Sequence, residues 1–234
     1  MKTLPAPGAC LLPSQCIDSE HPDIVAFVEA ITDPGLSDLE NAVALYYRVR
    51  DDIRYNPYAL GTHVEDYLAS TTLHAGEGWC VTKALLLAAV CRAAGIPARV
   101  GFADVVNHLS TERLRAVMKT EVFYFHGYTS IYLNDSWVKA TPAFNVELCE
   151  KFGLYPLEFD GLQDSLYHPF DVAGNKHMEY INDRGEHIDL PFDEMAAVFR
   201  LHYPSMFQQI SGRPGEVTDS ADWEAEVNRE VGLS

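Results

Sequence analysis

A cysteine at the start of an apolar helix is the feature of this chain best suited to chemistry. The run Gly76-Glu77-Gly78-Trp79-Cys80 leads into a mostly apolar segment that ends at Gly95. A helix N-terminus carries unpaired N–H groups and a partial positive charge, and both stabilise a thiolate. The sequence therefore predicts that Cys80 has a lowered pKa and acts as a nucleophile. The alternative is a small buried residue, which is the common fate of a free cysteine.

A thiolate nucleophile needs a base that takes up its proton and returns it to the leaving group. Of the nine histidines, His126 has the most suitable context. It lies in a predicted strand and precedes Gly127, where another element could approach closely. His74, which precedes Cys80 in the chain, is the main rival for this role. A third group must hold the imidazole ring of the base in position.

Several runs of the sequence resemble the transglutaminase-like core. The first is the Gly-x-Gly-x-Cys pattern that opens the Cys80 helix, and the second is the run from Cys91 to Val100, which reads CRAAGIPARV. The histidine strand of that family matches 126–133, and its next strand matches Trp137-Val138. The resemblance covers about residues 37–145. It implies an α+β fold with a papain-like core, in which the nucleophile helix packs on an antiparallel sheet. It also implies acyl transfer through a thioester.

The third catalytic residue of that family is replaced in this chain. The resemblance places an aspartate directly before a proline at the end of the second strand, and this position is Thr141. Three alternatives remain open. Thr141 holds the His126 ring through a neutral hydrogen bond, which is about half as strong as a charge-assisted one. Asn145 does so instead, as an asparagine does in papain-like proteases. Or the site is altered and no longer catalytic. Asp104, just after a predicted strand, is an additional candidate.

The remaining patterns predict the elements that position these residues. Apolar periodicity, caps and helix-ending residues predict helices at 24–31, 37–53, 80–94, 111–118, 146–152 and 192–202. Ser37 and Glu40 form the expected capping box of the second helix. Runs of β-branched and aromatic residues predict strands at 98–103, 122–133 and 137–141. Two further short runs, 178–181 and 186–189, flank Arg184-Gly185 and predict a hairpin.

The composition narrows the possible partners. The 234 residues carry a formal net charge of −17, which disfavours binding to nucleic acid and to anionic membrane surfaces. No apolar run approaches the roughly 20 residues that span a bilayer. The leader lacks the apolar centre of a secretory signal, so we expect a cytoplasmic protein. The five cysteines show neither a disulfide framework nor a zinc spacing.

The sequence predicts three regions along the chain. Residues 1–36 form a leader and a first helix, and residues 37–145 form the transglutaminase-like core. Residues 146–234 form an extension that packs on the core and ends in a loose acidic tail from about Ser211.

These observations predict a cysteine enzyme that acts on a peptide, amide or other acyl substrate through Cys80 and His126. Glu77 and Trp79 flank the nucleophile and are candidates for substrate binding, although a tryptophan is about as often a core residue. No metal and no organic cofactor are implied. The alternative function is a non-catalytic binding module that keeps the cleft as a ligand site.

Overall fold

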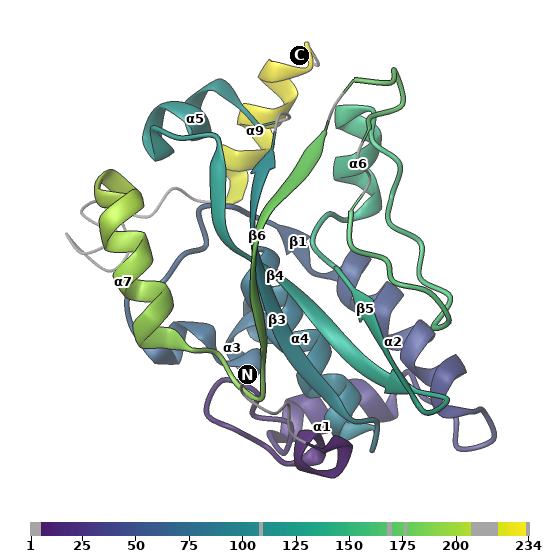
Figure 1. Ribbon diagram of the computed structural model, residues 1–234. Coiled ribbons are helices and arrows are strands. Elements are labelled where there is room, and N and C mark those ends of the chain that lie inside the picture. Colours follow the sequence, from purple (N-terminus) through teal and green to yellow (C-terminus); the bar gives the residue numbers. More distant parts are fainter. Residues whose placement is uncertain (1–5, 108–109, 168–169, 176, 207–219, 233–234) are drawn as a thin grey trace.

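An antiparallel sheet of four strands lies at the centre of the fold, in the order β5-β4-β3-β6 (Figure 1). The computed structural model describes residues 6–107, 110–167, 170–175, 177–206 and 220–232. The strands are β3 (Ala98–Asn107), β4 (Val122–Leu133), β5 (Ser136–Ala140) and β6 (Met178–His187). A separate parallel pair joins β1 (Arg54–Tyr55) to β2 (Glu77–Gly78). The predicted α+β fold with an antiparallel sheet is confirmed.

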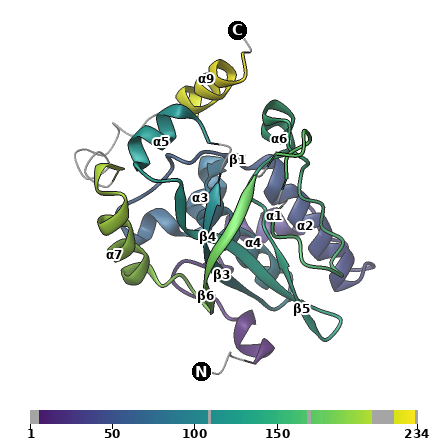
Figure 2. The same ribbon diagram turned by 45° about the horizontal axis from the view of Figure 1, so that its top comes forward.

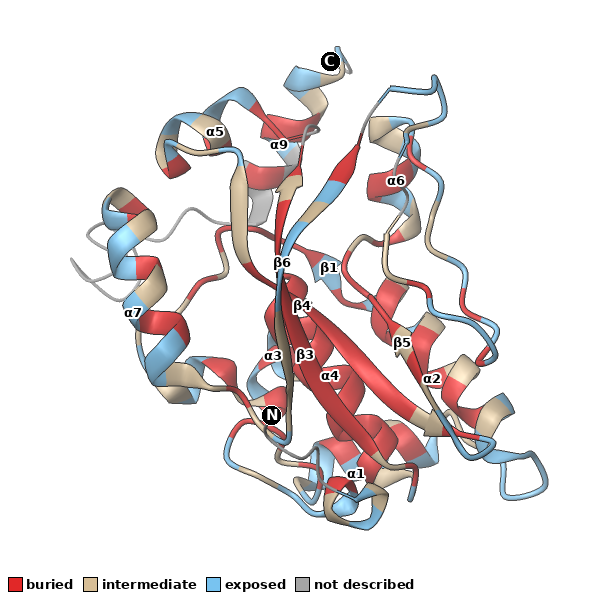
Figure 3. Cartoon of the chain, viewed as in Figure 1, coloured by how far each residue is buried: buried red, intermediate tan, exposed pale blue. Residues whose placement is uncertain are grey.

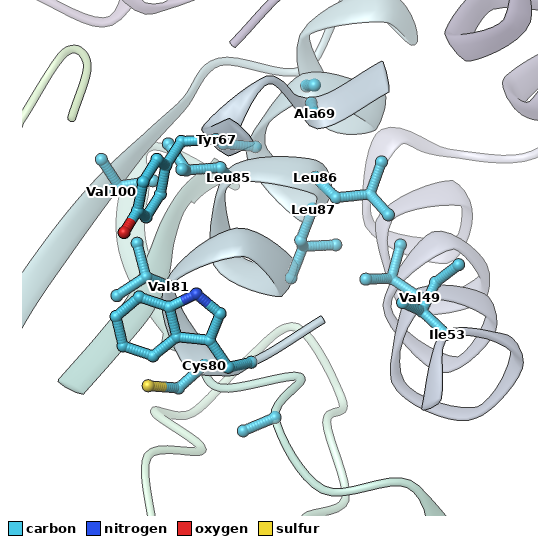
Figure 4. Packing of buried hydrophobic residues seen from close by; sticks show 14 of the residues in the cluster. Val49, Ile53, Tyr67, Ala69, Cys80, Val81, Leu85, Leu86, Leu87 and Val100 are labelled. Atoms are coloured by element: carbon cyan, nitrogen blue, oxygen red, sulfur yellow. The ribbon is translucent and has the colours of Figure 1, made fainter. Parts of the chain in front are cut away.

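One helix, α4 (Cys80–Ala93), packs against this sheet and is buried along its whole length except the last residue. A helix that is apolar on every side must be enclosed by other elements. Besides β3 and β4, it contacts α1 (Pro22–Glu29), α2 (Asp38–Asp52) and α3 (Ala69–Ala75). Figure 3 shows that buried residues concentrate in α4, β3 and β4. In Figure 4, Leu86 and Leu87 of α4 face Val49 and Ile53 at the end of α2.

The predicted capping box at the start of α2 is confirmed. The Ser37 N–H donates to Glu40 Oε2 at 2.8 Å, and the Glu40 N–H donates to Ser37 Oγ at 3.3 Å. These two bonds satisfy helix N-terminal groups that would otherwise lack partners. α2 therefore begins where the local sequence predicts.

The two arginines in the run from Cys91 to Val100 hold the chain together after α4. Arg92 is buried and donates to the carbonyl oxygens of Ala98 at 2.8 Å, Leu12 at 2.7 Å and Ile188 at 2.5 Å. Its guanidinium thus joins the end of α4 to β3, the N-terminal segment and the chain after β6. Arg99 forms an ion pair with Glu186 of β6, and its guanidinium carbon lies 3.7 Å from the centre of the Trp137 ring.

The hairpin predicted around Arg184-Gly185 is wrong. The two runs belong to one strand, β6, which pairs with β3 from Asn107↔Met178 to Val100↔His187. β3 continues past 103 to Asn107 and offers its whole edge to this strand, so long-range pairing overrides the local turn signal. The pairing register shifts between Phe102 and Ala103, and Gly185, the partner of Phe102, has a φ of 80° at this irregularity. α3 and the β1–β2 pair were also not indicated by the sequence.

Beyond β3, the described part of the chain forms the helices α5 (Glu112–Met118), α6 (Val146–Phe152), α7 (Phe192–His202) and α9 (Ser220–Glu230). Figure 2 shows α9 beside α5. Glu226 of α9 is buried and accepts hydrogen bonds from Tyr58 Oη at 3.0 Å and from Thr111. Trp223 and Val227 are also buried. Of the acidic tail, residues 211–219 lie outside the described residues, as do the first five residues of the leader.

No helix among the described residues combines the length and apolarity that a membrane span requires.

Candidate active site

Cys80 is the first residue of α4, and the backbone before it is shaped by glycines. Gly76 ends α3 in the left-handed region with a φ of 64°. A Cβ at Gly78 would lie 2.5 Å from Thr82 Oγ1, a position that this hydroxyl occupies because it accepts the Trp79 N–H at 3.1 Å. Glycine is therefore favoured at both positions of the Gly-x-Gly-x-Cys pattern: Gly76 adopts a left-handed conformation, and Gly78 leaves room for Thr82 Oγ1.

Burial raises the pKa of the Cys80 thiol, contrary to the lowered pKa that its position at the helix N-terminus predicts. The residue is 3% exposed, and burial raises the pKa of its thiol to about 12. The backbone N–H groups of Gly127, Val81 and Cys80 itself act on the sulfur in the opposite direction. Desolvation of a thiolate outweighs these dipoles. Figure 4 shows the Cys80 side chain at the edge of the apolar cluster around α4.

β4 approaches the start of α4 very closely, as the sequence predicts for Gly127. A Cβ on Gly127 would lie 2.9 Å from the Cα of Val81 and 3.0 Å from the carbonyl oxygen of Cys80. Farther along the strand, Thr129 Oγ1 donates to the Ala84 carbonyl oxygen at 2.8 Å. The backbone of β4 is thereby fixed on the first turn of α4, directly after His126.

The His126 imidazole is buried and neutral. Its Nε2 atom is inaccessible and has no hydrogen-bond partner, and the side chain is 4% exposed. Burial, and in second place the neighbouring His177, lower its pKa to about 4. No hydrogen bond joins this ring to the Cys80 sulfur in the part of the chain that the structure describes. Burial thus favours the neutral forms of both the thiol and the imidazole, and the neutral imidazole is the form of histidine that accepts a proton.

Thr141 lies in the same cavity as His126. It follows β5 directly, is 2% exposed, and its Oγ1 atom has no hydrogen-bond partner. The cavity contains about 370 Å³ of empty space, and its other walls are mainly apolar and aromatic, including Phe144, Tyr167 and Met178. His126 and Thr141 thus line one pocket, and each has a buried polar atom without a hydrogen-bond partner, which is costly unless something bonds to it.

Asn145 and His74 are positioned elsewhere. The side-chain oxygen of Asn145 accepts the Tyr55 N–H at 3.2 Å, and the residue lines a different cavity from the one that contains His126. His74 lies on the surface in the last turn of α3, and its Nε2 atom is 2.5 Å from Asp23 Oδ2. The structure therefore brings Thr141, and not Asn145, to the His126 cavity, and it pairs His74 with a surface carboxylate.

Asp104 is buried at the bulge of the sheet that precedes His126. Its carboxylate accepts from the Phe125 N–H at 3.2 Å, from Arg184 Nε at 2.6 Å and from Asn182 Nδ2 at 3.1 Å. Phe125 has a φ of 58°, which is strained for a bulky residue. Asp104 thus holds the backbone that carries His126, and it makes no hydrogen bond to the His126 ring itself.

Trp79 and Glu77, the two residues predicted to contact substrate, both contact other side chains of the protein. Trp79 is buried and lines the cavity that contains Cys80, with ring contacts to Tyr67 and Phe199. Its Nε1 atom has no hydrogen-bond partner. Glu77 Oε1 accepts from Asn56 Nδ2 at 3.4 Å, while Glu77 Oε2 is buried without one. Contact of either residue with substrate stays a prediction.

A buried lysine near the nucleophile was not found from the sequence. Lys83 lies one turn after Cys80 and is fully buried, and burial lowers its pKa to about 7. Its Nζ atom donates to the carbonyl oxygens of Arg50 at 2.8 Å, Ile53 at 2.5 Å and Ala143 at 2.8 Å. The available signal was a cation within the first turns of this mostly apolar helix, because a charge on a buried helix needs dedicated partners.

The described residues include no cluster of three or more histidine, cysteine, aspartate or glutamate side chains that could hold a metal ion.

A cysteine at the N-terminus of a buried helix, with a histidine on the adjacent strand of an antiparallel sheet, defines the papain-like class of fold. Within this class the chain belongs to the transglutaminase-like superfamily, whose family model matches residues 25–142, half of the chain. This membership places it in a family that includes cysteine enzymes.

Two solved structures are similar to this chain. A candidate cysteine protease from Cytophaga hutchinsonii has 17% sequence identity and a TM-score of 0.46, and the match covers 80% of this chain and 55% of that one. A candidate protease from Parabacteroides distasonis has 17% identity and a TM-score of 0.38, with coverage of 59% and 27%. The chain thus spans about half of the first protein's length. No curated protein matches the sequence.

Proposed function

We propose that this chain is a cysteine-dependent acyl-transfer enzyme, in which Cys80 attacks an amide or related acyl bond and forms a thioester. The observation that carries this proposal is the close approach of Gly127 to the first turn of α4. It supports a site in which His126, the preceding residue, takes up the proton of the Cys80 thiol, although in this structure the two side chains line different cavities. The exposed His74, paired with Asp23, offers no comparable arrangement.

Since burial favours a neutral Cys80 thiol and a neutral His126 imidazole, proton transfer between them accompanies the attack on the acyl carbon. The Cys80 thiol gives its proton to the neutral His126 imidazole as the sulfur bonds to the acyl carbon, and the resulting imidazolium returns the proton to the leaving amine. Water or a second amine then attacks the thioester. The Cys80 N–H acts on the sulfur in this structure and has no intrahelical partner, and we propose that it donates to the developing oxyanion once the sulfur has bonded to the acyl carbon. The Thr141 hydroxyl has no hydrogen-bond partner in this structure, and we propose that it accepts one from the ring during the reaction and so orients it.

Single-turnover acylation tests this proposal. With p-nitrophenyl butanoate as acyl donor, we expect release of nitrophenolate together with a butanoyl mass shift on the peptide that contains Cys80. Cys80→Ala should abolish both signals, and Cys91→Ala, on the same buried helix, should retain them. His126→Ala should slow acylation by about a hundredfold, while His74→Ala should leave the rate unchanged.

A second candidate function is a non-catalytic binding module. It is favoured by the raised pKa of the Cys80 thiol and the lowered pKa of His126, together with threonine in place of the family's aspartate. Nitrophenolate release that is equally fast in the parent and in Cys80→Ala, with no acyl group on Cys80, would favour this function over acyl transfer.

A further inference from the structure

The cavity that contains Cys80 is lined by apolar and aromatic side chains. It has about 360 Å³ of empty space, including the solvent at its mouth, and its walls include Trp79, Tyr124 and Tyr203, together with Leu114 and Met118 from α5. No described residue that lines it carries a formal charge. This contrasts with the chain as a whole, in which 51 of the residues are acidic or basic, 34 and 17 of each kind.

The polar atoms of these walls do not select for a charged ligand. The Tyr203 hydroxyl donates to the Val122 carbonyl oxygen at 2.8 Å and accepts the Tyr124 N–H at 2.6 Å, so it is already used within the protein. The Nε1 atom of Trp79 is buried and unpaired, and it is a neutral donor. What the cavity offers an incoming group is therefore mainly ring faces and aliphatic surface.

Electrostatics disfavour an acidic acyl group in this cavity. Burial already raises the pKa of the Cys80 thiol, because the cavity stabilises negative charge poorly. The oxyanion formed during acyl transfer would be a negative charge in the same space. A carboxylate on the acyl group would add another, with no cation among the described lining residues to pair with it, and an unpaired buried charge is very costly.

We propose, on the basis of the proposed function, that the acyl group transferred to Cys80 is uncharged and apolar, aliphatic or aromatic. It occupies the cavity between Trp79 and α5, where Leu114 and Met118 determine the preference. This inference deepens the proposed function, because acyl transfer by Cys80 does not by itself require an apolar acyl group.

A matched pair of activated esters tests this inference. The p-nitrophenyl ester of hexanoic acid and the p-nitrophenyl monoester of adipic acid have acyl chains of equal length and differ by a terminal carboxylate. In each reaction the ester C–O bond breaks, the Cys80 S–C bond forms, and nitrophenolate leaves. The second-order rate of Cys80 acylation is measured by mass spectrometry and divided by the rate of the same ester with free cysteine. We expect the hexanoate to acylate Cys80 at least about tenfold faster than the adipate.

A substitution on α5 provides a second measurement. Met118→Lys introduces a cation into the wall of the cavity and should raise the relative rate of the adipate, while Met118→Leu should keep the parent's preference. The comparison of the two esters on the parent protein stands even if Met118→Lys does not fold. Equal corrected rates for the two esters, or a faster adipate, would overturn this inference and leave acyl transfer by Cys80 intact. Failure of both esters, and of the butanoate, to acylate Cys80 would overturn the proposed function and this inference with it.

Discussion

The side-chain nitrogen of Lys83 donates a hydrogen bond of 2.8 Å to the carbonyl oxygen of Ala143. This bond joins the helix that begins with Cys80 to the segment that follows Thr141. The same nitrogen holds the carbonyl oxygens of Arg50 and Ile53 at the end of α2. One buried amine therefore sets the distance between the nucleophile helix, α2 and the chain beside the His126 cavity.

Replacing Lys83 should destabilise the protein strongly. Lys83→Met leaves three buried carbonyl oxygens without their donor, so we expect the free energy of unfolding to fall by about 3 kcal/mol or more. Urea unfolding followed by circular dichroism measures this change. Lys119→Met, at an exposed position, is the matched control and should change the stability by less than about 0.5 kcal/mol. Equal stabilities of the two variants would show that the Lys83 bonds contribute little.

Gly127→Ala should separate β4 from α4. The new Cβ would lie 2.9 Å from the Cα of Val81, a backbone atom that cannot move aside without shifting the helix. We expect a loss of about 2 kcal/mol or more in stability, typical of overpacking, and a lower rate of Cys80 acylation in the fraction that stays folded. Gly8→Ala is the control, because a Cβ at Gly8 meets no atom within 4 Å. Normal acylation by a stable Gly127→Ala variant would show that this contact does not position the site.

Alkylation of Cys80 should reveal a thiol with a high pKa. Since burial raises this pKa to about 12, the thiolate fraction grows with pH throughout the neutral and mildly alkaline range. The rate of labelling by iodoacetamide should rise about tenfold per pH unit from about pH 7 to pH 10, without a plateau. Mass mapping of the Cys80 peptide over this range measures the rate. A plateau beginning below about pH 8 would instead indicate a thiolate–imidazolium pair in the resting protein.

Burial of His126 should make the protein less stable in acid. The pKa of this imidazole is about 4 in the folded state against an ordinary value of 6.5. The His126 imidazole is neutral in both the folded and the unfolded chain above about pH 6.5. Between pH 6.5 and pH 4 it binds a proton in the unfolded chain but not in the folded one. The stability from this residue should therefore fall by up to about 3 kcal/mol as the pH drops through this window.

Urea unfolding at about pH 7 and about pH 4.5 measures this effect. The loss of stability between the two conditions should be smaller for His126→Asn than for the parent, and His74→Asn, at an exposed site, should lose as much as the parent. An unchanged pH dependence in His126→Asn would show that His126 is protonated normally in the folded protein.

Thr141 and Asn145 should respond differently to substitution. Thr141→Asp places a carboxylate in the His126 cavity, which should raise the pKa of the imidazole and speed acylation of Cys80, while Thr141→Val should slow it. Asn145→Ala removes the acceptor of the Tyr55 N–H, so we expect a loss of about 1 to 3 kcal/mol in stability with little effect on the acylation rate of the folded protein. A large fall in that rate for Asn145→Ala alone would reassign the orienting residue.

Local patterns were sufficient to predict most of the elements that carry the candidate site. The capping box at Ser37, the helix from Cys80 to Gly95 and the aromatic strand that contains His126 each depend on neighbouring residues, so their positions follow from caps, breakers and periodicity. Gly127 also marked a position where another element could approach closely, and the structure places α4 there.

Tertiary contacts decided the rest, because burial and long-range pairing cannot be read from neighbouring residues. The helix terminus predicts a lowered pKa for Cys80, yet enclosure of the thiol by elements from across the chain raises it. Asn145 and Thr141 were equal candidates along the sequence, and only the folded chain gives the Asn145 oxygen to Tyr55 and turns Thr141 toward the His126 cavity. Likewise, residues 178–189 were predicted to form a hairpin, but Met178–His187 form the single strand β6 along the edge of β3. A long sheet edge supplies more backbone hydrogen-bond partners than a local turn can.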